Sequence, residues 1–143
     1  MFEISAIFLF SRPRFNNDVE KIYDTKYGSD TSEVIDNINS LEAGGGTNIY
    51  SPSIEGLKIL KEDSDDEYTK TVILMTDGQS NVGSFNDLKK YYIRNKENVP
   101  IYSITFGDSS EYELNKLAEL SNGKVFDGKS GLLKAFTEVR SDN

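Results

Sequence analysis

Apolar and polar positions alternate with two different spacings along the chain. Short, nearly continuous runs of Ile, Val, Leu, Phe and Tyr are typical of strands that are covered on both faces. These runs predict strands at residues 2–10, 19–23, 71–75, 101–106 and 124–126, of which 19–23 is a short edge strand. Turn-forming residues follow most of these runs and end them. The pattern therefore predicts a sheet that is buried from both sides.

Between the strands, apolar residues recur every three or four positions, which is the spacing of one buried helix face. The predicted helices lie around residues 34–41, 51–60, 88–92, 110–122 and 130–139. Gly123 is expected to terminate the fourth of them. Strands separated by helices pair in parallel through right-handed crossovers, which places helices on both faces of the sheet. We therefore predict a three-layer α/β fold with a mostly parallel, Rossmann-like sheet.

The length of 143 residues, without a repeat or an interdomain linker, predicts a single domain spanning residues 1–143. No run approaches the roughly 20 apolar residues of a membrane span, so we expect the chain as given to be soluble. The apolar stretch at 4–10 follows Glu3 and no positive charge, which favours a strand over a signal peptide. Localisation stays open, because a longer parent protein could carry an export signal to the cell surface.

Composition removes several functions from consideration. The chain contains no Cys and no His, which excludes thiolate chemistry, a histidine general base and a His-liganded metal. Its net charge of -8 argues against nucleic acid as a partner, because phosphates require clustered Lys and Arg. Any bound metal must therefore be a hard cation with oxygen ligands.

Two loops place oxygen donors where an α/β sheet binds ligands, at the carboxyl ends of its strands. Asp77 directly follows the predicted strand at 71–75, and Gly78 beside it allows a ligand to come close. The Gly-rich loop at 44–46 leads to Thr47, just before a predicted helix whose N-terminal N–H groups favour an anionic partner. A hydroxyl and a carboxylate are suitable partial ligands for Mg²⁺, which keeps several waters.

Three ordered motifs resemble a bacterial von Willebrand factor A domain. They are Gly-Gly-Thr-Asn-Ile-Tyr at 45–50, Val-Ile-Leu-Met-Thr-Asp-Gly at 72–78 and Val-Pro-Ile-Tyr-Ser-Ile-Thr-Phe-Gly at 99–107. The segment at 117–126 also resembles the late helix and strand of that family, and the similarity runs from Phe2 nearly to the C-terminus. The resemblance implies a non-enzymatic protein-binding module, used in cell adhesion, with a metal-ion-dependent adhesion site at one rim of a parallel sheet.

The resemblance also implies roles for individual residues. Thr47 matches the threonine of the family's second metal-binding loop, and Asp77 matches the aspartate of the third. The implied cation is Mg²⁺, with Mn²⁺ or Ca²⁺ as substitutes, and an acidic side chain of a protein partner completes its coordination. The residues expected to form the partner-binding rim around the metal are Gly46, Asn48, Gly78, Gln79 and Ser80.

One part of the family pattern is absent. The first metal-binding loop, Asp-x-Ser-x-Ser after a central first strand, would precede Phe2, so we expect an N-terminally truncated, partial domain. Similar stretches at 30–32 and 108–110 lack the final serine and are interpreted as caps or turns. Without its usual neighbour, the strand at 2–10 must pair with 71–75, borrow a strand, or leave an exposed edge. We therefore predict a homo-oligomer joined through sheet edges, or a rearranged sheet.

Two other functions stay open. A metal-free fragment could associate through its sheet edges, with Thr47 as a hydroxyl at the start of a helix and Asp77 as a turn residue. Alternatively, Asp77 with Mg²⁺ could serve phosphoryl transfer in an α/β enzyme. That reaction usually needs a second carboxylate near the end of the first strand, where this chain has Ser11-Arg12-Pro13.

Overall fold

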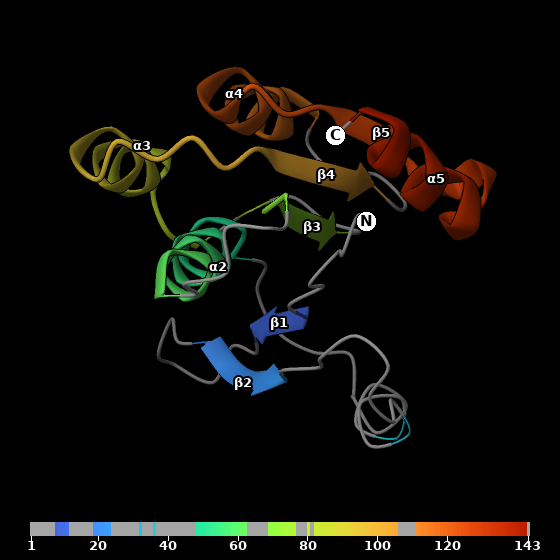
Figure 1. Cartoon of the computed structure of the whole chain (residues 1–143), viewed down its shortest axis with the longest axis horizontal. Helices are drawn as coiled ribbons and strands as arrows, with labels where there is room; N and C mark the ends of the chain where they lie inside the picture. Colours follow the sequence, from blue (N-terminus) through green and yellow to red (C-terminus); the bar gives the residue numbers. More distant parts are fainter. Residues whose placement is uncertain are drawn as a thin grey trace.

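The computed structural model describes residues 8–11, 19–23, 32, 36, 48–62, 69–76, 80, 82–105 and 111–142. Its strands are β1 (Phe8–Ser11), β2 (Val19–Tyr23), β3 (Val72–Thr76), β4 (Ile101–Thr105) and β5 (Val125–Asp127). Its helices are α2 (Tyr50–Glu62), α3 (Phe85–Arg94), α4 (Glu111–Ser121) and α5 (Leu132–Asp142), with a 3₁₀ turn, η1, at Gly128–Ser130 (Figure 1). Of the helix predicted around 34–41, only Asp36 is described, and it is helical, as is Ser32 just before the predicted start. The alternation of strands and helices confirms the predicted α/β class.

Three strands form an open parallel sheet in the order β3-β4-β5. Val72 lies opposite Ile101, and Ser103 lies opposite Val125, so β4 is central. The strands β1 and β2 form a separate antiparallel pair whose register shifts between Phe10 and Ser11. Among the strands that the structure describes, β1 therefore pairs with β2 and not with β3. The predicted pairing of the strand at 2–10 with 71–75 is thus wrong for Phe8–Ser11, the described part of that strand.

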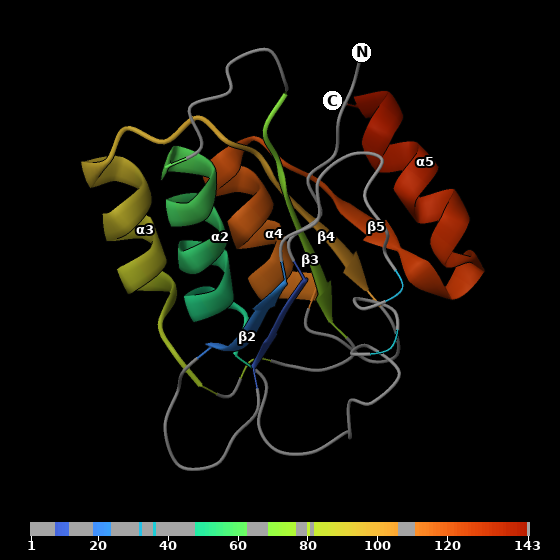
Figure 2. The ribbon, with the colours of Figure 1, turned by 60° about the horizontal axis from the view of Figure 1, so that its bottom comes forward.

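The central strand β4 is buried along its whole length because helices cover both of its faces. Ile101 packs with Leu57 of α2, Leu88 of α3 and Leu117 of α4. On the opposite face, Tyr102 and Ile104 pack with Ala135 and Val139 of α5. Each fully buried Leu, Ile or Val side chain contributes about 1.5–3 kcal/mol. Figure 2 shows the resulting layers, with α2, α3 and α4 on one side of the sheet and α5 on the other.

The junction between α4 and β4 fixes the spacing of these layers. The backbone N–H of Ile101 donates to the hydroxyl of Ser121 over 3.0 Å, and this hydroxyl donates to the carbonyl of Leu117 over 2.8 Å. Asn122 adopts the left-handed conformation, with φ 56°, that ends the helix. Gly123 has another role: a Cβ placed there would lie 2.0 Å from the carbonyl oxygen of Ile101. A glycine is required here because the two backbones approach so closely.

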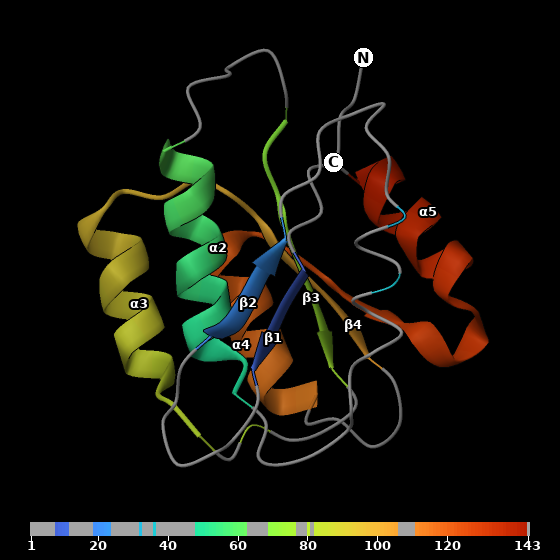
Figure 3. The same ribbon diagram turned by 90° about the horizontal axis from the view of Figure 1, so that it is seen from below.

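The parallel sheet directs its loops to one edge of the molecule. Figure 3 shows the carboxyl ends of β3 and β4 at the same edge of the molecule as the N-terminal ends of α2, α3 and α4. Backbone N–H groups at helix N-termini carry partial positive charge, which favours an acidic or anionic group at this edge. None of the described helices is long and apolar enough to cross a membrane.

Candidate functional site

The two predicted metal ligands belong to different loops of the chain. Thr47 and Asp77 lie outside the described residues, as do Gly46, Gly78 and Gln79 of the proposed rim. The neighbours on either side are described: Asn48 follows Thr47 directly, Thr76 precedes Asp77, and Ser80 comes three positions after it. These described neighbours lie at the carboxyl edge of the sheet.

The chain leaves the first loop through a capped helix start. The Oδ1 atom of Asn48 accepts hydrogen bonds from the backbone N–H groups of Tyr50 and Ser51, both over 3.1 Å. The Nδ2 atom of Asn48 donates to the hydroxyl of Ser51 over 3.0 Å. Such a cap stabilises a helix by about 0.5–2 kcal/mol. Asn48, predicted as a rim residue, is only 7% exposed and serves as this cap.

The loop after β3 packs against this helix start. The hydroxyl of Ser80 donates to the carbonyl of Val82 over 3.0 Å and accepts from the backbone N–H of Ile49 over 3.4 Å. Gly83 adopts φ 84°, and a Cβ at this position would lie 2.7 Å from Oδ1 of Asn48. The residues directly after Thr47 are therefore in contact with the segment that begins at Ser80, three positions after Asp77.

A carboxylate from α4 joins both segments. The hydroxyl of Tyr50 donates to Oε1 of Glu113 over 2.9 Å, and the backbone N–H of Ser80 donates to Oε2 over 3.2 Å. Burial of Tyr50, followed by its hydrogen bond to Glu113 and the charge of that carboxylate, raises the pKa of Tyr50 to about 12. Tyr50 therefore stays protonated at neutral pH and acts as a donor. The ring of Phe85 contacts the Tyr50 ring edge-on, with 6.3 Å between centroids.

The chemistry of the proposed donors fits Mg²⁺. The hydroxyl of Thr47 and the carboxylate of Asp77 are hard oxygen ligands, and Mg²⁺ is commonly held by few protein groups and several waters. Within the described part of the chain, no group of three or more acidic, His or Cys side chains could hold a metal by itself. Two protein ligands such as those predicted at Thr47 and Asp77 would leave the other positions of an octahedral ion to water.

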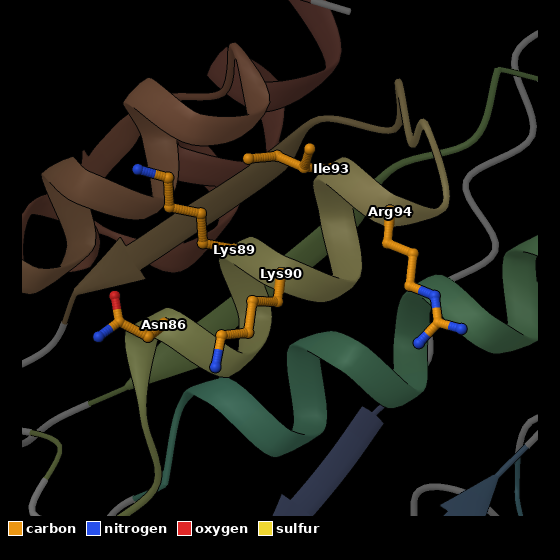
Figure 4. A pocket seen from close by; sticks show the side chains of 5 residues that line it. All are labelled: Asn86, Lys89, Lys90, Ile93 and Arg94. Atoms are coloured by element: carbon orange, nitrogen blue, oxygen red, sulfur yellow. The ribbon is translucent and has the colours of Figure 1, made fainter.

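Two pockets lie elsewhere on the described surface. One follows a single face of α3 and is lined by Asn86, Lys89, Lys90, Ile93 and Arg94 (Figure 4). All five side chains come from one helix, so this pocket is a solvated basic face, with Ile93 60% exposed. The other lies at the carboxyl ends of β4 and β5. Its lining includes Thr105, Glu111, Asn115, Asp127 and Lys129. Neither pocket is lined by Asn48 or Ser80.

Comparison with known protein families decides the identity of the fold. The von Willebrand factor type A domain matches residues 10–138. The chain belongs to this family. Searches of curated proteins and of solved structures found no match. Von Willebrand factor type A domains are generally non-enzymatic modules for protein interaction, and their α/β fold agrees with the parallel sheet and two helical layers described above.

Two residues of this von Willebrand factor type A domain were not identified as important from sequence. The sequence pattern singles out neither Glu113 nor Gly83 for the site. Glu113 contacts Tyr50 and Ser80 across separations of 63 and 33 residues, which no local pattern reveals. The cap formed by Asn48 was more accessible to prediction, because Asn is a preferred residue immediately before a helix.

Proposed function

We propose that this von Willebrand factor type A domain is a non-enzymatic protein-binding module whose contact surface lies at the carboxyl edge of the sheet. Its centre is a partial metal-ion-dependent adhesion site in which Thr47 and Asp77 hold the ion. The observation that supports this proposal is the contact between the two flanking segments. The backbone nitrogen of Ile49 lies 3.4 Å from the hydroxyl oxygen of Ser80, and Gly83 packs against Asn48.

The proposed cation is Mg²⁺, with Mn²⁺ or Ca²⁺ as substitutes, and the proposed partner is a protein that presents an acidic side chain. When bound, the metal supplies a positive centre for that carboxylate. Gly46, Gly78, Gln79 and Ser80 surround this position in the proposal, and Asn48 supports it from below by capping α2. The N-terminal ends of α2 and α4 at the same edge add partial positive charge that favours the acidic partner.

Metal binding can be tested by thermal unfolding in EDTA and in increasing Mg²⁺, Mn²⁺ or Ca²⁺. At a hundredfold excess over Kd, a bound ion stabilises the folded state by about 2.7 kcal/mol. For a domain of this size, that corresponds to a rise in Tm of roughly 10 °C. We expect the rise to disappear in Thr47→Ala and Asp77→Asn. Asp87→Asn, which removes an exposed carboxylate from α3, is the matched control and should keep the rise.

An unchanged Tm with all three cations would contradict the metal site.

The metal-free alternative is association through sheet edges, and one observation favours it. The strands β1–β2 and β3–β4–β5 form two separate sheets, so β3 is an edge strand among the described strands. Unpaired strand edges are templates for pairing with another chain. Light scattering over a range of protein concentrations, with and without metal, distinguishes a concentration-dependent homo-oligomer from a monomer.

A further inference from the structure

Glu113 lies where three segments meet at the carboxyl edge of the sheet. It belongs to the first turn of α4, where its negative charge is favoured by the helix dipole. One of its carboxylate oxygens contacts the start of α2 at Tyr50, and the other contacts the loop after β3 at Ser80. Tyr50 comes three residues after Thr47, and Ser80 comes three residues after Asp77. Glu113 therefore contacts, in each of the two segments, the residue three positions after a proposed metal ligand.

The two contacts are strongest with a carboxylate. Both partners present a hydrogen to Glu113: the phenol of Tyr50 and the backbone N–H of Ser80. An ionised carboxylate has two acceptor oxygens and can serve both donors at once. A glutamine of the same shape can keep its carbonyl oxygen for the N–H of Ser80, but its NH₂ group then faces the phenol of Tyr50, which must turn from donor to acceptor. Glu113→Gln therefore replaces two charge-assisted hydrogen bonds by weaker neutral ones, with little change of volume.

The surroundings limit how far the two partners of Glu113 can move. Tyr50 is 5% exposed, and its ring contacts Phe85 at the start of α3. Ser80 is held a second time through its hydroxyl, by Ile49 and Val82. A carboxylate that joins two such restrained groups fixes the start of α2 relative to Ser80.

We propose that Glu113 is a positioning residue for the proposed metal site, holding the loops of Thr47 and Asp77 at the separation that lets them share one ion. The inference rests on the proposed function. Glu113 acts through Tyr50 and Ser80, without being a metal ligand itself. Residues that orient metal ligands in this indirect way typically contribute about 10- to 100-fold to metal affinity.

The test is the affinity of the folded protein for Mn²⁺, measured by calorimetry well below Tm for wild type, Glu113→Gln and Glu111→Gln. Glu111 lies in the same first turn of α4, is exposed, and loses the same charge, which makes it the matched control. We expect Glu113→Gln to bind Mn²⁺ about 10- to 100-fold more weakly. Glu111→Gln should bind Mn²⁺ within about twofold of wild type, because the charge of an exposed side chain is screened by salt.

A purely structural role would lower Tm and leave the Mn²⁺ affinity of the folded protein unchanged, which would overturn the proposal. Equal losses in Glu113→Gln and Glu111→Gln would also overturn it, because they would reflect net charge alone. Tyr50→Phe, which keeps Glu113 and removes one donor, tests the same contact if Glu113→Gln fails to fold, and should weaken Mn²⁺ binding by a smaller factor.

The result for wild type separates this proposal from the one on which it rests. Absence of Mn²⁺ binding by wild type overturns the metal site itself, and the role of Glu113 with it. Retention of wild-type affinity in Glu113→Gln overturns the positioning role alone. NMR of labelled tyrosine provides a readout that needs no metal: the loss of the carboxylate charge should lower the pKa of Tyr50 from about 12.

Discussion

Replacement of Gly83 by alanine should disturb the cap of α2 from a different segment of the chain. Gly83 adopts φ 84°, where an L-residue costs about 1–2 kcal/mol relative to glycine. Its new Cβ would also lie 2.7 Å from Oδ1 of Asn48, closer than carbon and oxygen pack. If Asn48 shifts to relieve this contact, its two hydrogen bonds to the start of α2 weaken, which costs about another 1 kcal/mol. We therefore expect Gly83→Ala to lower the free energy of unfolding by about 2–3 kcal/mol in total.

A double-mutant cycle with Asn48→Ala isolates the steric part of this cost. In the Asn48→Ala background, the closest remaining neighbour of the new Cβ is Cδ2 of Tyr50 at 3.3 Å. The added cost of Gly83→Ala should then fall to the backbone contribution, about 1–2 kcal/mol. Urea unfolding followed by circular dichroism measures all four proteins. Equal costs of Gly83→Ala in both backgrounds would refute the proposed contact with Asn48.

Gly131→Ala is the control for the site. Gly131 adopts φ 127°, but a Cβ there meets no atom within 4 Å. Its cost therefore comes from backbone strain alone. It also lies between η1 and α5, and no contact joins it to Asn48 or Ser80 among those described. If the contact of Gly83 with Asn48 supports the metal loops, Gly83→Ala should weaken Mn²⁺ binding and Gly131→Ala should not.

Three further predictions concern the core and the site. Ser103 is fully buried, and its hydroxyl has no hydrogen-bond partner among the residues that the structure describes. Ser103→Ala should therefore stabilise the protein by about 1 kcal/mol, a rise in Tm of roughly 4 °C, and a fall in Tm would show that the hydroxyl is satisfied. Gly123→Ala should cost more than about 3 kcal/mol in urea unfolding, because its Cβ meets the backbone of Ile101 and neither backbone can shift without breaking helix or sheet contacts. The raised pKa of Tyr50 favours its protonated form in the folded state, so its contribution to stability is complete below pH 10 and is lost as pH rises toward 12. The free energy of unfolding of Tyr50→Phe should therefore fall less than that of wild type between pH 10 and 12.

The sequence was sufficient to predict the parallel half of the fold. The apolar run at 71–75 predicted β3, observed at Val72–Thr76, and the run at 101–106 predicted β4, observed at Ile101–Thr105. Leu88 and Tyr92, predicted to mark one helix, are both buried on the inner face of α3. These features depend on the spacing and type of apolar residues within a short stretch of chain, so they can be predicted from local sequence.

Partner choice between distant segments could not be read in this way. The strand at 2–10 had several predicted arrangements, and its described part, β1, pairs antiparallel with β2. Nothing in the local pattern of Phe8–Ser11 specifies which neighbouring strand supplies the hydrogen bonds. The same limitation applies to the site, where Glu113 and Gly83 act on residues that are distant in sequence. The sequence motifs indicated Thr47 and Asp77 as candidate ligands, whereas the contacts that position their loops required the fold.

The separation of the described strands into two sheets has a consequence for the order in which the molecule opens. The β1–β2 pair adjoins the rest of the protein at α2, which also packs on β3. A two-stranded ribbon has little stability of its own. It should therefore detach in sub-global fluctuations that leave the β3–β4–β5 sheet intact. Backbone amides in β1 and β2 should exchange with solvent water through these partial openings, and amides in the fully buried β4 only through global unfolding.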